Sequence, residues 1–326
     1  MRGRRYGGSR IRVQGSWLSQ AAKPSARFRV NCYCLKVNIE RDGRNGKENE
    51  IDKKDMADER HLTPEEEWQQ AEDERLEYEG YCRKIIQGLE NQGEKSGIRA
   101  IWELVQNARD LSDNARIKIE LNAGSLVFSH HGRPFDYTSF RALVKQDSSK
   151  DRADANIVGQ YGTGFMTTHT FNRLVFVTAP FAVKRGQNEI SGYVQIKDFA
   201  LDRTKVDTAD GPKLMRKQLN DVRELCNKQK SQSIEDDTTS FRYDLRLEQL
   251  DEVSRYLAGA VKLMPFVLIL NEHIKEIEVD NRYRGKNYVF RKSGEPSLFQ
   301  MDIAGWIGAE ENVEISDLRN GGVEKC

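Results

Sequence analysis

The chain lacks an apolar run long enough to cross a membrane. Its longest apolar stretch, residues 264–270, is interrupted by Pro265 and has a length typical of a buried strand. Cysteine is scarce as well, because the five cysteines are scattered, and the spacing of Cys32 and Cys34, without a second such pair, does not fit a zinc site. These absences argue against a membrane protein and against a cysteine metal site, and they predict reduced thiols in a cytoplasmic protein.

Neither sign of charge is in excess, since the chain has 52 lysines and arginines and 51 aspartates and glutamates. The whole-chain charge therefore indicates no polyanionic partner such as nucleic acid. Acidic residues are absent, however, from residues 1–39. We interpret residues 1–55 as a basic N-terminal extension, for which four explanations stay open: disorder without function, a start placed too early ahead of Met56, contact with nucleic acid, and organelle targeting.

A helix is predicted over residues 97–111, because apolar residues recur there at helical spacing. They are Ile98, Ile101, Trp102, Val105 and Ala108. At about 100° per residue, Glu103, Asn107 and Asp110 fall within about 60° of one another on the opposite face. One helix face thus presents a carboxylate, an amide and a second carboxylate, a pattern that on its own is typical of a solvated surface.

A glycine-rich stretch follows about fifty residues later. Gly159, Gly162 and Gly164 are spaced G-x-x-G-x-G, which lets backbone N–H groups approach a ligand closely. Residues 165–169 are predicted to open a helix, whose N-terminus attracts phosphate. The stretch lacks the Gly-Lys-Ser/Thr of a Walker loop, and its glycine order is the reverse of the dinucleotide-binding fingerprint.

Taken in this order, the two stretches resemble the GHKL ATPases, which include gyrase, the large heat-shock chaperones, histidine kinases and MutL. The motif sequences are most similar to those of the heat-shock chaperone and sacsin-like branches. The resemblance covers residues 64–279. It implies an α+β fold of the Bergerat type, a two-layer sandwich in which a mixed, mainly antiparallel sheet is covered by helices on one face. We therefore expect an ATP-binding domain over residues 56–280. Residues 281–326 are expected to be the start of a second domain or a truncated C-terminal segment.

The resemblance also assigns roles to residues. Glu103 is expected to be the general base for the attacking water, and Asn107 a ligand of Mg²⁺. The glycine backbone is expected to stabilise charge that develops on the γ-phosphoryl group of ATP. The complete set of expected nucleotide-binding residues is Asn107, Asp110, His130, Gly132, Ser148, Ser149, Lys150, Gly159, Gly162, Thr163, Gly164, Phe165 and Thr239.

Within that set, the chain departs from the family at residues 130–134. The family usually has D-x-G-x-G there, with an aspartate that accepts a hydrogen bond from the adenine amino group. In this chain His130 stands at the aspartate position, Gly132 is kept, and Pro134 replaces the second glycine. A neutral imidazole has one acceptor nitrogen and a protonated imidazole has none, so nucleotide binding would depend on pH. Histidines without a ligand role are the alternative.

The polar residues 147–154 occupy the place of the family's lid over the nucleotide. Ser148, Ser149 and Lys150 could supply hydroxyl groups and one cation to the phosphates, and a solvated loop is the alternative. The acidic helix predicted over residues 64–89, with Thr63 as its cap, is either solvated or a dimer contact. The remaining predictions are strands at 116–121, 125–128, 174–177, 192–196, 238–245, 266–270, 274–279, 288–290 and 298–302, a helix at 214–228 inside a surface insertion, and a helix at 250–264.

Two functions follow from the resemblance. The first is ATP binding with slow Mg²⁺-dependent hydrolysis, which drives a chaperone-like or sacsin-like clamp that acts on a protein client and could dimerise through the N-terminal domain. The second is a weakly hydrolysing or non-hydrolysing nucleotide-sensing module of a larger defence or DNA-processing protein. A histidine kinase fits poorly, because His61 stands in an acidic context at a cap-like position. A DNA-binding repair protein also fits poorly, because no concentrated basic patch follows the N-terminal extension.

Overall fold

The structure is a computed structural model that describes residues 63–91, 96–146, 164–186, 189–300, 307–317 and 322–325. The chain divides into two units, Met1–Arg60 and His61–Cys326, and every described residue belongs to the second. The expected basic extension, residues 1–55, lies outside the described residues.

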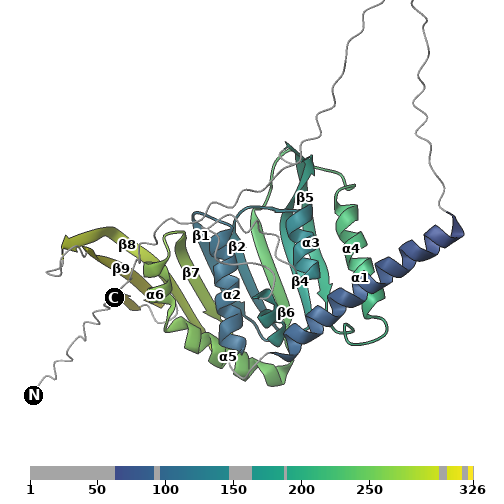
Figure 1. Ribbon diagram of the computed structural model, residues 1–326. Helices are drawn as coiled ribbons and strands as arrows, with labels where there is room; N and C mark the ends of the chain where they lie inside the picture. The colour runs from purple at the N-terminus through teal and green to yellow at the C-terminus, as the bar shows by residue number, and fades with distance from the viewer. Residues whose placement is uncertain are drawn as a thin grey trace, which may run out of the picture. The chain divides into compact units, whose positions relative to one another are not determined.

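The second unit has two layers, a sheet and a layer of helices on one of its faces (Figure 1). Strand β1 (Ala115–Leu121) explains the arrangement, because Ile117 and Ile119 are buried while Arg116 and Lys118 point to the opposite face. Alternation with a period of two makes one face of a sheet apolar, and the helices bury that face. The expected α+β fold, a two-layer sandwich with a mainly antiparallel sheet, is confirmed.

Ten strands form the sheet, in the order β10-β9-β8-β7-β1-β2-β6-β4-β3, with β5 paired to β4. Only β1 with β7 and β3 with β4 are parallel among the described pairs. After β1, the bounds are β2 Ser125–His131, β3 Phe135–Asp136, β4 Leu174–Arg185, β5 Glu189–Asp202, β6 Thr238–Asp244, β7 Ile274–Asn281, β8 Lys286–Gln300, β9 Ile307–Asp317 and β10 Gly322–Lys325. Strands β8, β9 and β10, in the segment expected to begin a second domain, extend the same sheet.

The helical elements are α1 Pro64–Glu90, α2 Ser96–Asp110, α3 Tyr137–Lys145, the 3-10 helix η1 Phe165–Thr170, α4 Gly211–Leu225, α5 Leu247–Val261 and α6 Met264–Leu270. Helix α1 begins as its sequence predicts. The Thr63 hydroxyl accepts a hydrogen bond from the Glu66 backbone N–H, and the Glu66 carboxylate accepts one from the Thr63 N–H. Pro64 occupies the first turn, where its missing N–H costs nothing.

The prediction of a strand within residues 264–270 is wrong, because this apolar run forms the short helix α6. A run of seven apolar residues fits either element, and Pro265 at the helix start was the signal for a helix. Among the described residues, no single helix is long and apolar enough to span a membrane, although α5 and α6 together reach that length and apolar character across a 47° bend.

The interpretation of residues 202–237 as a surface insertion is also wrong for its helix. Helix α4 packs against α1 and α3, and Met215, Leu219 and Val222 are buried in the core. The many charged residues of this segment concealed an apolar stripe at helical spacing. The predicted helix itself is confirmed, whereas α3 was not predicted.

Candidate functional site

Helix α2 carries the first motif. Ile101, Leu104, Val105 and Ala108 are buried and fix one face of the helix to the core, as its periodicity predicts. The opposite side is not a fully solvated surface. Asn107 is only 3% exposed, the Asp110 side chain only 4% and the Glu103 side chain only 17%. Polar side chains with so little exposure on one helix face are typical of a binding site and rare on a solvated surface.

The structure brings Glu103 against the end of the glycine-rich stretch. A Cβ atom added to Gly164 would lie 2.1 Å from Oε2 of Glu103 and 2.8 Å from its carboxyl carbon. The carboxylate therefore rests on the Cα atom of Gly164, immediately before η1, and its Oε1 lies 3.5 Å from Nε of Arg99. Glu103 and Gly164, which lie far apart in the sequence, thus meet at one place.

Glycine is required at position 164 by this approach and not by its backbone conformation, since φ is −66° and ψ is −48°, which any residue adopts. We expect Gly164→Ala to fold normally but to displace the Glu103 carboxylate, and so to lower any ATPase rate about as much as removing that carboxylate. Single-turnover phosphate release measures the effect. Gly80→Ala is the control, because a Cβ at Gly80 meets no atom within 4 Å. If Gly164→Ala lowered the rate further in a Glu103→Gln background, a cause other than carboxylate displacement would be at work.

Strand pairing places His130 on β2 directly opposite Thr239 on β6. Both residues are buried on the side of the sheet that the helices cover. Neither His130 Nε2 nor Thr239 Oγ1 has a hydrogen-bond partner in the part of the chain that the structure describes. Nδ1 of His130 lies 3.3 Å from the carbonyl oxygen of His131. The tautomer with hydrogen on Nδ1 donates that bond and leaves Nε2 as an acceptor.

Burial determines the charge of His130. Loss of hydration lowers the pKa of its imidazole to about 4, while the bond to the His131 carbonyl acts weakly in the other direction. The side chain is therefore neutral near pH 7. The expected dependence of binding on the protonation of His130 accordingly moves to acid pH.

Gly132 lets the end of β2 approach the end of α2. A Cβ at Gly132 would lie 2.9 Å from the carbonyl oxygen of Leu111, and the Arg133 N–H donates to that same oxygen at 2.9 Å. The Arg133 guanidinium donates to the carbonyl oxygen of Asp110 at 2.8 Å. These contacts hold the segment after His130 against the helix that carries Asn107 and Asp110.

Several expected site residues lie outside the described residues, namely Ser148, Ser149, Lys150, Gly159, Gly162 and Thr163. Phe165, at the start of η1, is fully buried and packs on Phe241 with ring centroids 5.2 Å apart. Its side chain thus anchors η1 in the core and leaves its backbone beside Gly164.

A resident metal cluster is not present in the described part of the chain, where no three His, Cys, Asp or Glu side chains converge. Mg²⁺ bound with phosphates needs no such cluster, because it keeps several waters and takes one or two protein ligands. Asn107, which is buried, can supply one such ligand through its amide oxygen. Its Nδ2, which has no hydrogen-bond partner among the described residues, is a donor that can bond a phosphate oxygen.

A buried polar cluster next to η1 was not predicted from the sequence. Arg203 is fully buried, and its Nη2 donates to the carbonyl oxygen of Val144. Its Nε and Nη1 have no hydrogen-bond partner among the residues that the structure describes. Burial lowers its pKa to about 10, and burial together with this guanidinium lowers the pKa of His169 to about 3. Polar residues dispersed along the chain give no periodic signal, so sequence reasoning could not have found this cluster.

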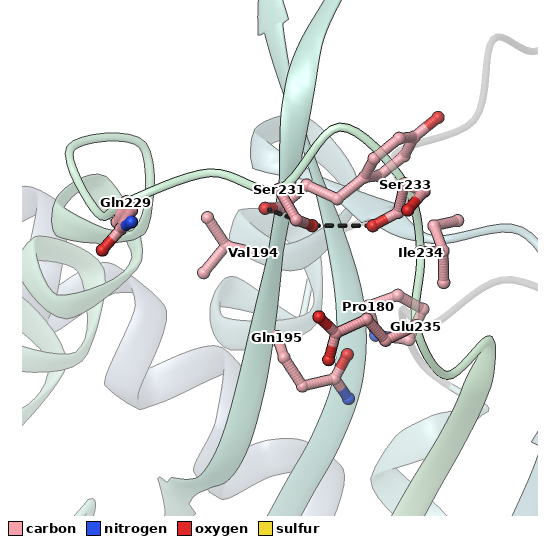
Figure 2. A pocket seen from close by; sticks show the side chains of 9 residues that line it. Pro180, Val194, Gln195, Gln229, Ser231, Ser233, Ile234 and Glu235 are labelled. Atoms are coloured by element: carbon pink, nitrogen blue, oxygen red, sulfur yellow. Dashed lines mark hydrogen bonds between the residues drawn. The ribbon is translucent and has the colours of Figure 1, made fainter.

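A cavity of about 160 Å³ lies elsewhere, between β4, β5 and the segment after α4 (Figure 2). Across its upper side the Ser231 hydroxyl donates to the carbonyl oxygen of Ser233 at 2.6 Å, and the Ser231 backbone N–H donates to the carbonyl oxygen of Tyr193 at 2.8 Å. Its lining contains one carboxylate, Glu235, and no cation. None of the lining residues comes from α2, β2 or η1, so this cavity is separate from the site around Glu103.

No protein-family model matches the chain, and no curated protein matches it. Among solved structures, it is similar to the B-subunit of the DNA gyrase from Myxococcus xanthus, with 8% identity and a TM-score of 0.29. The match covers 67% of this chain and 61% of the gyrase chain.

Proposed function

We propose that this chain binds ATP with Mg²⁺ in the manner of the GHKL ATPases and hydrolyses it slowly. One observation carries the proposal: the Glu103 carboxylate rests on Gly164, the last glycine of the G-x-x-G-x-G stretch, so the expected general base lies against the end of the expected phosphate-binding backbone. Neither sequence motif alone dictates this contact.

Buried polar atoms without partners support a ligand at this site. Asn107 Nδ2, His130 Nε2 and Thr239 Oγ1 are all in this condition. Leaving a buried donor or acceptor unsatisfied costs about 1 to 3 kcal/mol per group. A ligand that supplies hydrogen bonds to these atoms recovers that free energy on binding.

The atoms suit an adenine nucleotide in particular. His130 Nε2 is an acceptor, which matches a donor such as the adenine amino group, whereas the guanine O6 is itself an acceptor and would repel it. The hydroxyl of Thr239, opposite His130, can donate to a neighbouring ring nitrogen. Isothermal titration of ATP, ADP and GTP, with and without Mg²⁺, tests the proposal. Equal affinity for ATP and GTP would remove His130 from base recognition, and binding of neither would end the proposal.

The chemistry follows from the positions of two groups on α2. Mg²⁺ neutralises phosphate charge when bound, and the Asn107 amide oxygen would be its protein ligand. One turn away, the Glu103 carboxylate can accept a proton from the attacking water. Gly164 leaves room for that carboxylate beside the nucleotide phosphates.

A pH prediction arises from His130. Its pKa is about 4 in the folded chain and about 6.5 in the unfolded chain, so the unfolded chain binds the extra proton first as pH falls. The stability that depends on neutral His130 is complete above pH 6.5 and is lost as the pH falls toward 4. The free energy of unfolding of the parent should fall between pH 7 and pH 5, and that of His130→Asn should fall by about 2 kcal/mol less. Urea denaturation at the two pH values measures both.

The control for that measurement is His131→Asn, because His131 is exposed and pairs with Asp237 at the surface. Identical pH slopes for His130→Asn and the parent chain would mean that His130 does not stay neutral in the fold.

A second function, nucleotide sensing with little or no hydrolysis, is favoured by His130 at the position where the family has aspartate. The two functions share the site and differ in turnover. Phosphate release under saturating ATP–Mg²⁺ separates them: steady turnover supports the ATPase, whereas tight binding without release of phosphate supports the sensor. A chaperone-like or sacsin-like clamp, a protein client and a homodimer remain parts of the first proposal.

A further inference from the structure

The first half of α1 projects from the rest of the unit. Figure 1 shows its N-terminal end lying beyond α4, and none of residues 64–75 is buried. Trp68 in this segment is 67% exposed. An exposed tryptophan is a large apolar surface in water, and tryptophan is the residue most enriched at the energetic centres of protein interfaces.

This half of the helix is strongly acidic, with six acidic residues and one basic residue, Arg75, between positions 64 and 75. Arg75 pairs within its own helix, with Glu72 at 2.6 Å and with Glu79. Acidic residues in the first turn stabilise the positive end of the helix, which accounts for residues 65–67. That effect ends with the first turn, Glu72 pairs with Arg75, and Glu74 pairs with Arg216 of α4 at 3.2 Å. None of these interactions accounts for Asp73 or for the exposed ring of Trp68.

The second half of α1 holds the helix in place. Tyr78, Cys82 and Ile85 are buried, and a Cβ at Gly88 would lie 2.8 Å from Cγ of Met166 in η1. The helix is continuous over 27 residues, or about 40 Å. The projecting half is therefore presented as a rigid helix, and a partner held there sits on the same helix that packs against η1.

We propose that residues 64–75 of α1 are a docking surface for a basic protein segment, one that bears lysines or arginines and an apolar side chain to cover Trp68. The acidic charge opposes nucleic acid and anionic lipid. It also opposes a pairing of this helix with the same helix of a second copy, because acidic side chains would then face acidic side chains. The charge fits a cationic segment, and the ring of Trp68 supplies apolar area.

A short fluorescein-labelled amphipathic peptide of lysine and leucine is the probe, titrated with the full chain by fluorescence anisotropy. We expect salt-sensitive binding. Removing three charges by Glu65→Gln, Glu67→Gln and Asp73→Asn should weaken it about tenfold, and Trp68→Ala should weaken it at least about tenfold. These three acids have no ion pair among the described residues, and their exchange leaves the capping box of Thr63 and Glu66 intact. Circular dichroism confirms that the helix persists.

The matched control removes the same charge elsewhere, at three exposed acids outside α1: Glu224→Gln, Glu235→Gln and Glu272→Gln. Binding within about twofold of the parent supports the proposal. Equal weakening by both triple variants would indicate a general effect of net charge and overturn it. Absence of probe binding, or unchanged affinity in Trp68→Ala, would overturn it as well. None of these peptide-binding measurements involves nucleotide, so their outcome does not depend on whether the chain binds ATP.

Discussion

Glu103→Gln is expected to lower the rate of ATP hydrolysis by about 100- to 10,000-fold, the contribution typical of a positioned general base. Glutamine has the shape of glutamate, so it keeps the contact with Gly164 while losing the ability to accept a proton. ATP affinity should stay within a few-fold of the parent. Single-turnover phosphate release measures the rate, and calorimetry measures the affinity.

Arg99→Ala is the control for this prediction. Nε of Arg99 lies 3.5 Å from the Glu103 carboxylate, but its side chain is 68% exposed, so the pair is screened by solvent. Its loss should change turnover only slightly. If Glu103→Gln retained the parent rate, Glu103 would not be the base, and the contact with Gly164 would have only a packing role.

Helical periodicity predicted α2, because Ile101, Val105 and Ala108 recur at the spacing that a buried face needs. The same helical geometry, about 100° per residue, predicted that Glu103 and Asn107 share a face. Alternation predicted β1 and β2 for the corresponding reason at a period of two. These local regularities leave a signature in the residues themselves.

Contacts between distant segments leave no such signature. Nothing local to Gly164 states that a carboxylate rests on its Cα atom, because the backbone there is ordinary helical geometry. The resemblance named His130 and Thr239 separately, and only the register of β2 with β6 places them opposite each other. Helix α4 was misjudged because its charged side chains outweighed its apolar stripe, which becomes visible only against α1 and α3.

Asn107→Leu separates a binding role from a structural one. Leucine is close to asparagine in shape, and it replaces a buried amide whose Nδ2 has no hydrogen-bond partner. A buried donor left unsatisfied costs about 1 to 3 kcal/mol, and an apolar side chain of similar shape removes that cost. We therefore expect an unfolding midpoint equal to or above that of the parent, together with a loss of Mg²⁺-dependent ATP affinity of about 10- to 100-fold.

If Asn107 is a ligand residue, Asn107→Leu keeps or raises the unfolding midpoint while it lowers the Mg²⁺-dependent ATP affinity. A structural asparagine would give the reverse pattern, with a lower unfolding midpoint and any loss of ATP affinity present equally with and without Mg²⁺. Gln106→Leu is the matched control, because Gln106 is the exposed neighbour of Asn107 on α2. Its exchange should leave nucleotide affinity unchanged at either Mg²⁺ concentration. A buried Nδ2 without a hydrogen-bond partner among the described residues is a cost to folding, and a bound metal–triphosphate that accepts a hydrogen bond from it is the gain that would explain it.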